Sequence, residues 1–264
     1  LTTGGYNTAV GYYAMAESTV GASNTVIGYE AGKKLGKNAA STDNIVIGKQ
    51  AMDLADGGEA SNIAIGADAL GSADEGGSDT IDSNICIGQN AGLAGAATFV
   101  GNVAIGHQAL DATSTNDQTG TIAIGHQALT ALTSGSGNTA VGYNSGLALT
   151  TGANNVIMGY QAFDAADRGE SGNVAIGTYA LGALKEGTGG GDSNNNVAIG
   201  YNALLGGDFS SNARNLDGNI AIGANALTST STNASTGQIA IGHSALTAVT
   251  SGAGNTAIGY QAGD

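Results

Sequence analysis

The sequence contains no proline, no tryptophan, a single cysteine and only seven lysine or arginine residues among 264. The lone Cys86 excludes an intramolecular disulfide framework. Seven cations against 21 aspartates and glutamates give a formal net charge of -14. Because phosphate binding needs clustered lysine and arginine, we expect no nucleic-acid partner. No apolar run reaches the roughly 18 residues of a membrane-spanning helix, so we expect no membrane insertion.

The chain is rich in glycine and poor in large side chains. The chain has 46 glycines, far above the usual ~7%. Only 5% of the residues are aromatic, and much of the 41% hydrophobic content is alanine. This composition excludes an ordinary core of large side chains and predicts that apolar area is buried in thin layers.

A short motif repeats along the whole chain, and we align its copies on the glycine that follows a small apolar run, which we call the motif glycine. The spacing between copies is 17 to 23 residues. We therefore predict that residues 1–264 form a single repeat array. The motif glycines are Gly11, Gly28, Gly48, Gly66, Gly88, Gly106, Gly125, Gly142, Gly159, Gly177, Gly200, Gly223, Gly242 and Gly259.

Four residues before the motif glycine, twelve of the fourteen copies have asparagine, and Thr121 and Gln238 are the exceptions. Stacked asparagine amides can hydrogen-bond to one another along a stack of strands, which favours a structural ladder; a ligand-binding role for the same residues is the alternative. The column comprises Asn7, Asn24, Asn44, Asn62, Asn84, Asn102, Asn138, Asn155, Asn173, Asn196, Asn219 and Asn255.

The repeat unit is too short for a helix pair, rich in glycine and β-branched residues, and lacks a 3.6-residue period. Residues 63–65 (Ile-Ala-Ile) alternate large and small side chains, as a strand does. We predict an all-β fold, a parallel β-solenoid (β-roll) of about fourteen coils of 17–23 residues. We expect the Ile or Val before each motif glycine to point inward, and the mostly alanine face to be covered by the opposite wall of the coil or by another chain.

The two ends of the chain fall inside repeat units. The opening LTTGGYN matches LTTGANN at residues 149–155, and the closing residues 261–264 stop just after a motif glycine. Residues 119–143 also match residues 236–260, which indicates that blocks of several units were duplicated together. We interpret the chain as a segment cut from a longer array at both ends.

The sequences NVAIG (102–106, 173–177, 196–200) and NIAIG (62–66, 219–223) resemble the coil motif of the head domains of trimeric autotransporter adhesins. GNTAIGYQAG (254–263) is similar to repeats of phage tail-fibre and other surface-fibre proteins. The resemblance implies left-handed coils, a homotrimer and a role in attachment. The adhesin coils are shorter and carry an extra residue between Asn and Ala-Ile-Gly, which favours a fibre protein over a true autotransporter.

No catalytic motif is present: the sequence lacks G-x-S-x-G, H-E-x-x-H and a P-loop. We therefore expect no enzyme activity, no catalytic residues and no cofactor. The three histidines all follow a motif glycine directly. They are interpreted as a surface ladder, with a metal layer between several chains as the alternative. Two acidic groups (Asp74, Glu75, Asp79 and Asp82; Asp164, Asp167 and Glu170) are interpreted as solvated loop charge, with Ca²⁺ binding as the alternative.

Tyrosines share the position of the histidines and predict an aromatic ridge. The ridge could stack on sugar rings, or its rings could pack on one another and stiffen the array. Its residues are Tyr12, Tyr29, His107, His126, Tyr143, Tyr160, Tyr201, His243 and Tyr260. The long connections at 71–83, 182–195 and 205–218 are a second candidate recognition edge.

These features predict a structural or adhesive fibre segment, extracellular, on a cell surface or a virion. It would act as a rigid rod that attaches to a host or another surface, with itself, surface glycans or a host receptor as partners. A self-polymerising extracellular filament or sheath subunit is the alternative. An ice-binding solenoid fits less well, because threonine stands three residues before the motif glycine only at Thr8, Thr25, Thr139 and Thr256.

Overall fold

The computed structural model describes residues 4–72, 80–93, 98–112, 116–166, 168–183, 193–206, 215–228, 235–249 and 252–264. All regular elements in these ranges are β-strands, and none of them contains a helix. The chain divides into two compact units, Leu1–Ser136 (unit 1) and Gly137–Asp264 (unit 2). The predicted all-β parallel β-solenoid is confirmed, whereas a single array over residues 1–264 stays a prediction.

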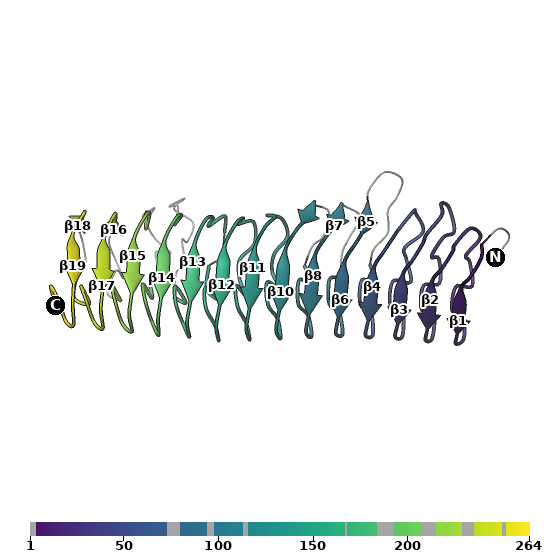
Figure 1. Cartoon of the computed structure of the whole chain (residues 1–264), viewed down its shortest axis with the longest axis horizontal. Helices are drawn as coiled ribbons and strands as arrows, with labels where there is room; N and C mark the ends of the chain where they lie inside the picture. Colours follow the sequence, from purple (N-terminus) through teal and green to yellow (C-terminus); the bar gives the residue numbers. More distant parts are fainter. Residues whose placement is uncertain are drawn as a thin grey trace. The chain divides into compact units, whose positions relative to one another are not determined.

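Unit 1 contains a main sheet of seven three-residue strands, and each of these strands carries one copy of the motif (Figure 1). A second, three-stranded sheet lies on the opposite wall of the coils. The main-sheet strands are β1 (Thr8–Val10), β2 (Thr25–Ile27), β3 (Ile45–Ile47), β4 (Ile63–Ile65), β6 (Ile85–Ile87), β8 (Val103–Ile105) and β10 (Ile122–Ile124). The opposite-wall strands are β5 (Ile81–Asp82), β7 (Phe99–Val100) and β9 (Gln118–Thr119).

Unit 2 repeats this plan with its own seven motif strands and a two-stranded sheet on the opposite wall. The main-sheet strands are β11 (Thr139–Val141), β12 (Val156–Met158), β13 (Val174–Ile176), β14 (Val197–Ile199), β15 (Ile220–Ile222), β17 (Ile239–Ile241) and β19 (Thr256–Ile258). The opposite-wall strands are β16 (Ser235–Thr236) and β18 (Gly252–Ala253).

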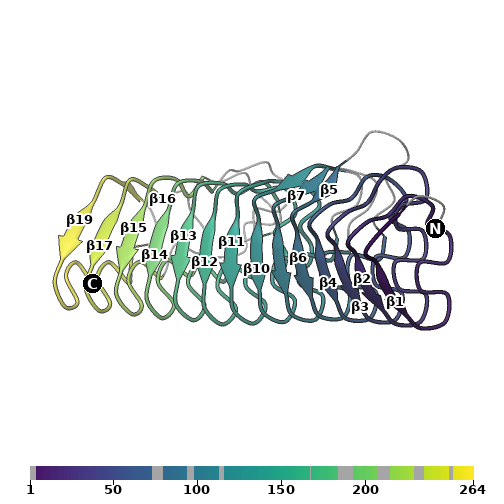
Figure 2. The same ribbon diagram turned by 45° about the vertical axis from the view of Figure 1, so that its right-hand side comes forward.

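Neighbouring main-sheet strands pair in parallel and in register. Ile63 faces Ile85, and Ala64 faces Cys86, so each motif position lies on its equivalent in the next coil. Figure 2 shows the chain leaving each strand at a tight bend and returning along the opposite wall before the next strand. Six complete turns lie between seven strands in each unit, which gives about twelve turns in the two units.

The motif glycine ends each strand because no other residue fits there. Gly66 has a φ of +136°, which L side chains rarely adopt. A Cβ at Gly66 would also lie 2.6 Å from the carbonyl carbon of Gly88 in the next coil. The repeat of glycine therefore follows from the close stacking of backbones at the bend.

The bend after the glycine uses left-handed backbone at two positions, two and four residues further on. In the coil of Gly66 these are Asp68 (φ 56°) and Leu70 (φ 52°). Left-handed backbone favours glycine, which explains why the fourth position is glycine in other copies, such as Gly32 (φ 50°). β-branched residues are absent from this position in every copy.

The prediction that the Ile or Val before the motif glycine points inward is wrong. Ala64, two residues before Gly66, is fully buried, whereas Ile63 and Ile65 are half-buried on the other face of the strand. The same alternation occurs in the other inner coils, so the alanine column faces the interior of its own coil. Of the two covers considered for this column, the opposite wall of the coil is the one present.

The interior is thin because its columns consist mostly of small residues. The residue three after the motif glycine is fully buried, as at Ala69, and the next residue, Leu70, is fully buried beside it. Space is tight: a Cβ at Gly32 would lie 3.2 Å from the Cγ1 of Val26. The interior column therefore holds mostly alanine, with Val26, Val46, Cys86 and Ile157 as its larger members, and the Ile and Val side chains on either side of it lie outside.

Candidate functional site

The asparagine column lies inside the coils and forms a continuous hydrogen-bonded ladder within each unit. At Asn84, both the backbone N–H and Nδ2 donate to Oδ1 of Asn62, each at 3.0 Å. The same Nδ2 donates across the coil to the carbonyl of Phe99 at 2.6 Å. From Asn24 to Asn219 the side chains are buried, so they do not face a ligand in solvent.

The two exceptions to the asparagine pattern differ in how they continue the ladder. Gln238 continues the ladder in both directions: its N–H donates to Asn219 Oδ1, its Oε1 accepts from the N–H of Asn255, and its Nε2 donates to the carbonyl of Gly252. Thr121 donates its backbone N–H to Asn102 Oδ1, but its buried hydroxyl has no hydrogen-bond partner. The ladder therefore depends on an amide side chain rather than on asparagine alone.

The outward face of each main sheet, which we call the outer face, is uncharged and mostly apolar. It consists of the residues one and three before each motif glycine, which are Ile, Val, Met or Thr in every copy, and none of these side chains is fully buried. Ile27 and Met158 are 38% and 45% exposed. Sequence reasoning missed this surface because it placed the larger side chains inside; the signal was the buried asparagine, which shares a face with the alanine two residues later.

The aromatic ridge forms stacks of parallel rings on neighbouring coils. Ring centroids lie 5.5 Å apart for Tyr12 and Tyr29, and 5.2 Å apart for His107 and His126. In unit 2 they lie 5.4 Å apart for Tyr143 and Tyr160, and also for His243 and Tyr260. Because the ring faces lie against one another, the rings present mainly edges and hydroxyls to solvent, and the geometry favours packing over stacking on sugars.

Two further tyrosines that the prediction omitted lie beside the ridge. Tyr179 contacts Tyr160 and Tyr201 edge to face, with centroid distances of 5.8 and 6.4 Å. Tyr13 contacts Tyr12 in the same manner at 4.4 Å, with Lys33 Nζ 5.9 Å from the Tyr13 ring centroid. Both stand two residues after a motif glycine, at the first left-handed position, so their direction depends on backbone that the repeat pattern did not reveal.

Unit 1 has a cavity of about 360 Å³ beside Asp53, Asp68 and Asn90. The pKa of Asp53 is raised to about 6, mainly by burial and also by the negative charges of Asp68 and Glu30, against the lowering effects of a backbone hydrogen bond and of Lys33. Among the described residues, no three His, Cys, Asp or Glu side chains are grouped as metal ligands. Of the predicted acidic clusters, Asp74, Glu75, Asp79 and Asp167 lie outside the described residues.

Two glutamates occupy the interior of the opposite wall, seven residues before a motif glycine. Glu59 accepts hydrogen bonds from the Ser41 hydroxyl and from the N–H of Gly57, the latter at 2.7 Å. Burial raises the pKa of Glu59 despite these bonds, which favour the ionised form. Glu170, in the corresponding place in unit 2, is 1% exposed.

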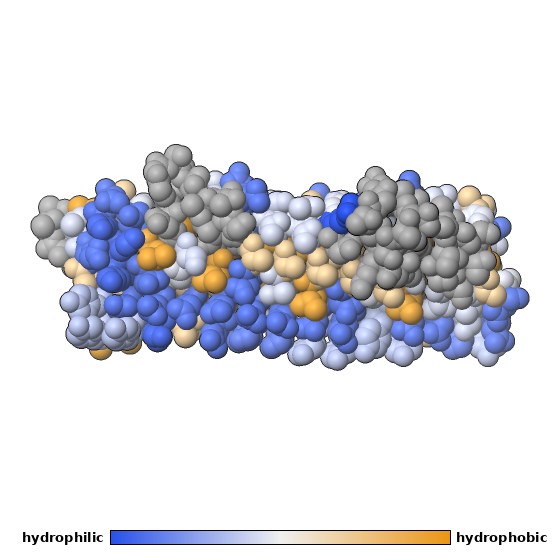
Figure 3. Space-filling model, turned by 180° about the vertical axis from the view of Figure 1, so that it is seen from behind, coloured by the Kyte–Doolittle hydropathy of each residue, from blue (hydrophilic) through white to orange (hydrophobic). Residues whose placement is uncertain are grey.

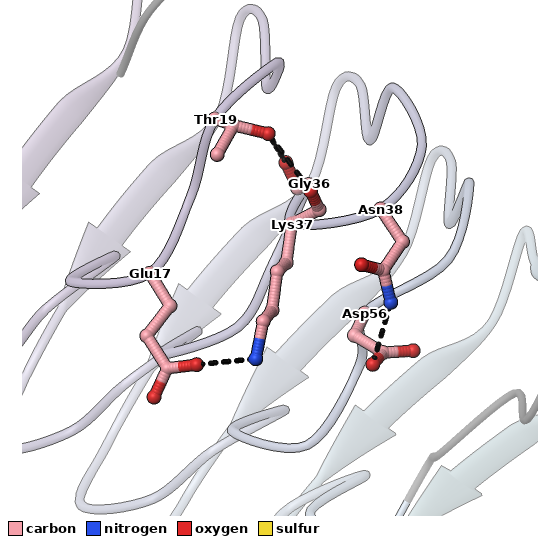
Figure 4. A network of polar contacts seen from close by, with 6 residues as sticks. All are labelled: Glu17, Thr19, Gly36, Lys37, Asn38 and Asp56. Atoms are coloured by element: carbon pink, nitrogen blue, oxygen red, sulfur yellow. Dashed lines mark hydrogen bonds and ion pairs between the residues drawn. The ribbon is translucent and has the colours of Figure 1, made fainter.

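Polar contacts between coils also line one edge of unit 1 (Figure 4). Lys37 Nζ lies 2.7 Å from Glu17 Oε2, and Asn38 Nδ2 donates to Asp56 Oδ2 at 2.9 Å. The hydrogen bond to Lys37 lowers the pKa of Glu17, and the same contact raises the pKa of Lys37.

The face of the molecule opposite to that of Figure 1 is shown in Figure 3. Hydrophilic residues cover much of its lower part, with small hydrophobic areas among them.

Comparison with family models, curated proteins and solved structures found no match. A search of the described residues for helices also found none with the length and apolar character needed to cross a membrane. The candidate sites of this chain are the outer face and the aromatic ridge, and both are defined by its own structure.

Proposed function

We propose that this chain is a structural segment of an extracellular fibre, on a cell surface or a virion, in which copies of the chain bundle side by side through their outer faces. Following the resemblance to adhesin heads, the proposed assembly is a homotrimer of left-handed coils. Its role is mechanical: it holds an attachment structure at a distance from the surface that carries it. Attachment comes from repeated weak contacts, whose avidity rises with their number.

The outer face is the observation that supports this proposal. The chain carries a net charge of -14, yet no charged residue stands at either outer-face position in any copy. Parallel sheets are normally covered on both faces, and contiguous apolar surface marks an interaction site. A second copy supplies a matching surface, because its outer face has the same strand spacing, the same β-branched side chains and no charge.

The aromatic ridge is the second surface of the proposed fibre segment and would contact glycans. Its exposed edges and hydroxyls offer hydrogen bonds and short apolar contacts to a glycan that lies along the coils. A glycan array tests this part separately, with wild-type chain compared with a Tyr29→Ala and Tyr160→Ala double variant. Signals that are equal for the two proteins would remove the ridge from the binding role.

The mass of the assembly in solution tests the bundle. We expect light scattering to give three chains for the wild type, and an Ile87→Glu and Ile222→Glu double variant to dissociate at least tenfold more readily, because each new carboxylate would be buried without a partner. The matched control carries Gln89→Glu and Ala224→Glu, which add the same charges two residues along, off the outer face, and stays trimeric. A wild-type monomer at all concentrations contradicts the proposal. Open-ended polymers in negative-stain micrographs would favour the filament alternative.

A further inference from the structure

We propose that the stacked tyrosines on neighbouring coils are oxidative cross-linking sites: a peroxidase acting with hydrogen peroxide joins Tyr12 to Tyr29 and Tyr143 to Tyr160 as dityrosine. Each bond would fasten one coil covalently to the next. The proposal does not depend on the fibre function, because both tyrosines of each pair belong to one unit of one chain.

The backbone holds the two rings of each pair one above the other. Val10 pairs with Ile27, and Val141 pairs with Met158, so the tyrosines two residues later leave their strands at equivalent places. The rings are nearly parallel, with interplanar angles of 14° for Tyr12 and Tyr29 and 11° for Tyr143 and Tyr160. Stacked parallel phenols bring the carbons ortho to the hydroxyls of both rings to the same side, where a bond between the rings must form.

The four rings are also open to an oxidant. Tyr12 and Tyr29 are 63% and 48% exposed, and Tyr143 and Tyr160 are 46% and 47% exposed. A peroxidase intermediate can therefore take an electron from each ring without unfolding the coil. Bond formation requires the rings of each pair to move closer, because their centroids lie 5.5 and 5.4 Å apart.

The reaction balances without any group from the protein beyond the two phenols. Each tyrosine loses one electron and its phenolic proton, which gives a radical with spin density on the ortho carbons. Two such radicals form one carbon–carbon bond, and each ring regains aromaticity as its ortho hydrogen moves to the phenolic oxygen. The two electrons and two protons reduce one hydrogen peroxide to two water molecules, so each cross-link costs the chain two hydrogen atoms.

Parallel stacking, rather than distance alone, selects these pairs over the other tyrosines, because Tyr13 lies only 4.4 Å from Tyr12 between ring centroids but at an interplanar angle of 65°. A radical whose partner is held on the next coil meets it at a high effective concentration. Tyr6 is 95% exposed but stacks on no ring in the described part of the chain, and Tyr260 stacks on His243, which forms no dityrosine. Tyr179 lies at 89° to Tyr160 and at 76° to Tyr201, so its ring does not stack in parallel on either neighbour.

The test treats the folded full-length chain with horseradish peroxidase and hydrogen peroxide, then maps cross-linked peptides by mass spectrometry after digestion beside acidic residues. We expect the Tyr12–Tyr29 and Tyr143–Tyr160 cross-links to dominate, each with a mass lower by two hydrogens than the sum of its peptides. The same treatment in concentrated urea should lose this selectivity. Dityrosine in the folded chain that joins other tyrosines, or joins them only between chains through Tyr6, overturns the proposal.

Conservative variants separate a specific site from general reactivity, because phenylalanine keeps the ring stack. Tyr29→Phe should abolish the first cross-link and leave the second, and Tyr143→Phe should do the reverse. Tyr6→Phe and Tyr260→Phe serve as matched controls and should leave both yields unchanged. If Tyr6→Phe lowers the total yield as much as Tyr29→Phe and Tyr143→Phe together, coupling follows exposure rather than stacking and the proposal fails.

Discussion

In unit 1, the main-sheet wall has seven strands of three residues in unbroken register, whereas the opposite wall has three strands of two residues and isolated bridges between Ala22, Thr42, Ala60 and Asp82. The interior side chains of the two walls differ in the same way. Those of the main sheet are an amide and a small residue in nearly every coil, whereas those of the opposite wall vary from coil to coil. The varied positions are Ser41, Glu59, Ile81, Phe99 and Gln118.

This contrast indicates that the regular side chains of the solenoid are concentrated in one wall. Backbone hydrogen bonds join successive coils in both walls, for example from the N–H of Phe99 to the carbonyl of Thr80 on the opposite wall. The main sheet adds the asparagine ladder to this pairing, whereas the opposite wall accommodates large, small and acidic side chains as well as connections of different length. Substitutions in each wall test whether the two walls differ in their contribution to stability.

Asn84→Ala should have the largest effect. It removes the hydrogen bonds of Asn84 to Asn62 and Phe99, and it leaves the buried N–H of Asn102 without its acceptor. We expect a loss of about 4 kcal/mol in the free energy of unfolding, since each buried group left unpaired costs roughly 1–3 kcal/mol. Urea unfolding followed by circular dichroism measures this change. Phe99→Leu on the opposite wall is the comparison and should cost about 1 kcal/mol. Equal losses would mean that the walls do not differ.

Ala104→Leu tests the interior assignment of the alanine column. Ala104 is fully buried, so the larger side chain should overpack the coil and cost about 2 kcal/mol. Ile105→Thr, one residue along on the half-buried outer face, should change the stability of the isolated chain by less than about 0.5 kcal/mol. Thermal unfolding of both variants at low protein concentration checks the order. A larger loss for Ile105→Thr would reverse the two faces.

Two carboxyl groups, those of Asp53 and Glu59, should make the folded chain more stable in mild acid than at neutral pH. The pKa values of Asp53 and Glu59 are raised in the folded chain, so the folded state binds their protons more tightly than the unfolded state does. This stabilisation is fully present below the unfolded pKa and is lost as the pH rises through the folded pKa, which for Asp53 means from 3.8 to about 6. Urea midpoints measured across that range should fall with rising pH.

Glu59→Gln should weaken this pH dependence, because a neutral amide can accept from the N–H of Gly57 and donate to Ser41 Oγ. The Asp53→Asn variant should weaken it further, and Asp43→Asn, a substitution of an exposed aspartate, is the control. A steeper fall of the urea midpoint with rising pH in the Glu59→Gln variant would contradict the expected sign.

Lys37→Met should have the smallest effect. Its ion pair with Glu17 is exposed, with side-chain exposures of 39% and 38%, and exposed pairs contribute little because water and salt screen them. We expect no measurable change in the urea midpoint at physiological salt. A clear destabilisation that persists at high salt would show that the edge contacts of Figure 4 support the register together with the main sheet.

The class of fold could be predicted from the sequence because the length and composition of the repeat unit exclude other folds. A unit of 17–23 residues with one Ile-Ala-Ile-like segment and a recurring glycine cannot form a core alone, so stacking was the remaining solution. The same pattern predicted the asparagine ladder, one short strand in each unit and the stacking of equivalent aromatic side chains. It did not predict Tyr13 and Tyr179 beside the ridge, because their direction depends on left-handed backbone at the bend.

The spacing of the recurring residues can be read from the sequence, and with it the residues that lie on top of one another in successive coils. The face of the strand that lies inside became apparent only from the three-dimensional packing. Alternation with a period of two is satisfied equally by either orientation, and the preference of large apolar side chains for the interior favoured the wrong one. The asparagine ladder settled the matter, because Asn62 shares a face of the strand with Ala64 and is buried and hydrogen-bonded inside the coil, so Ile63 and Ile65 lie on the outer face.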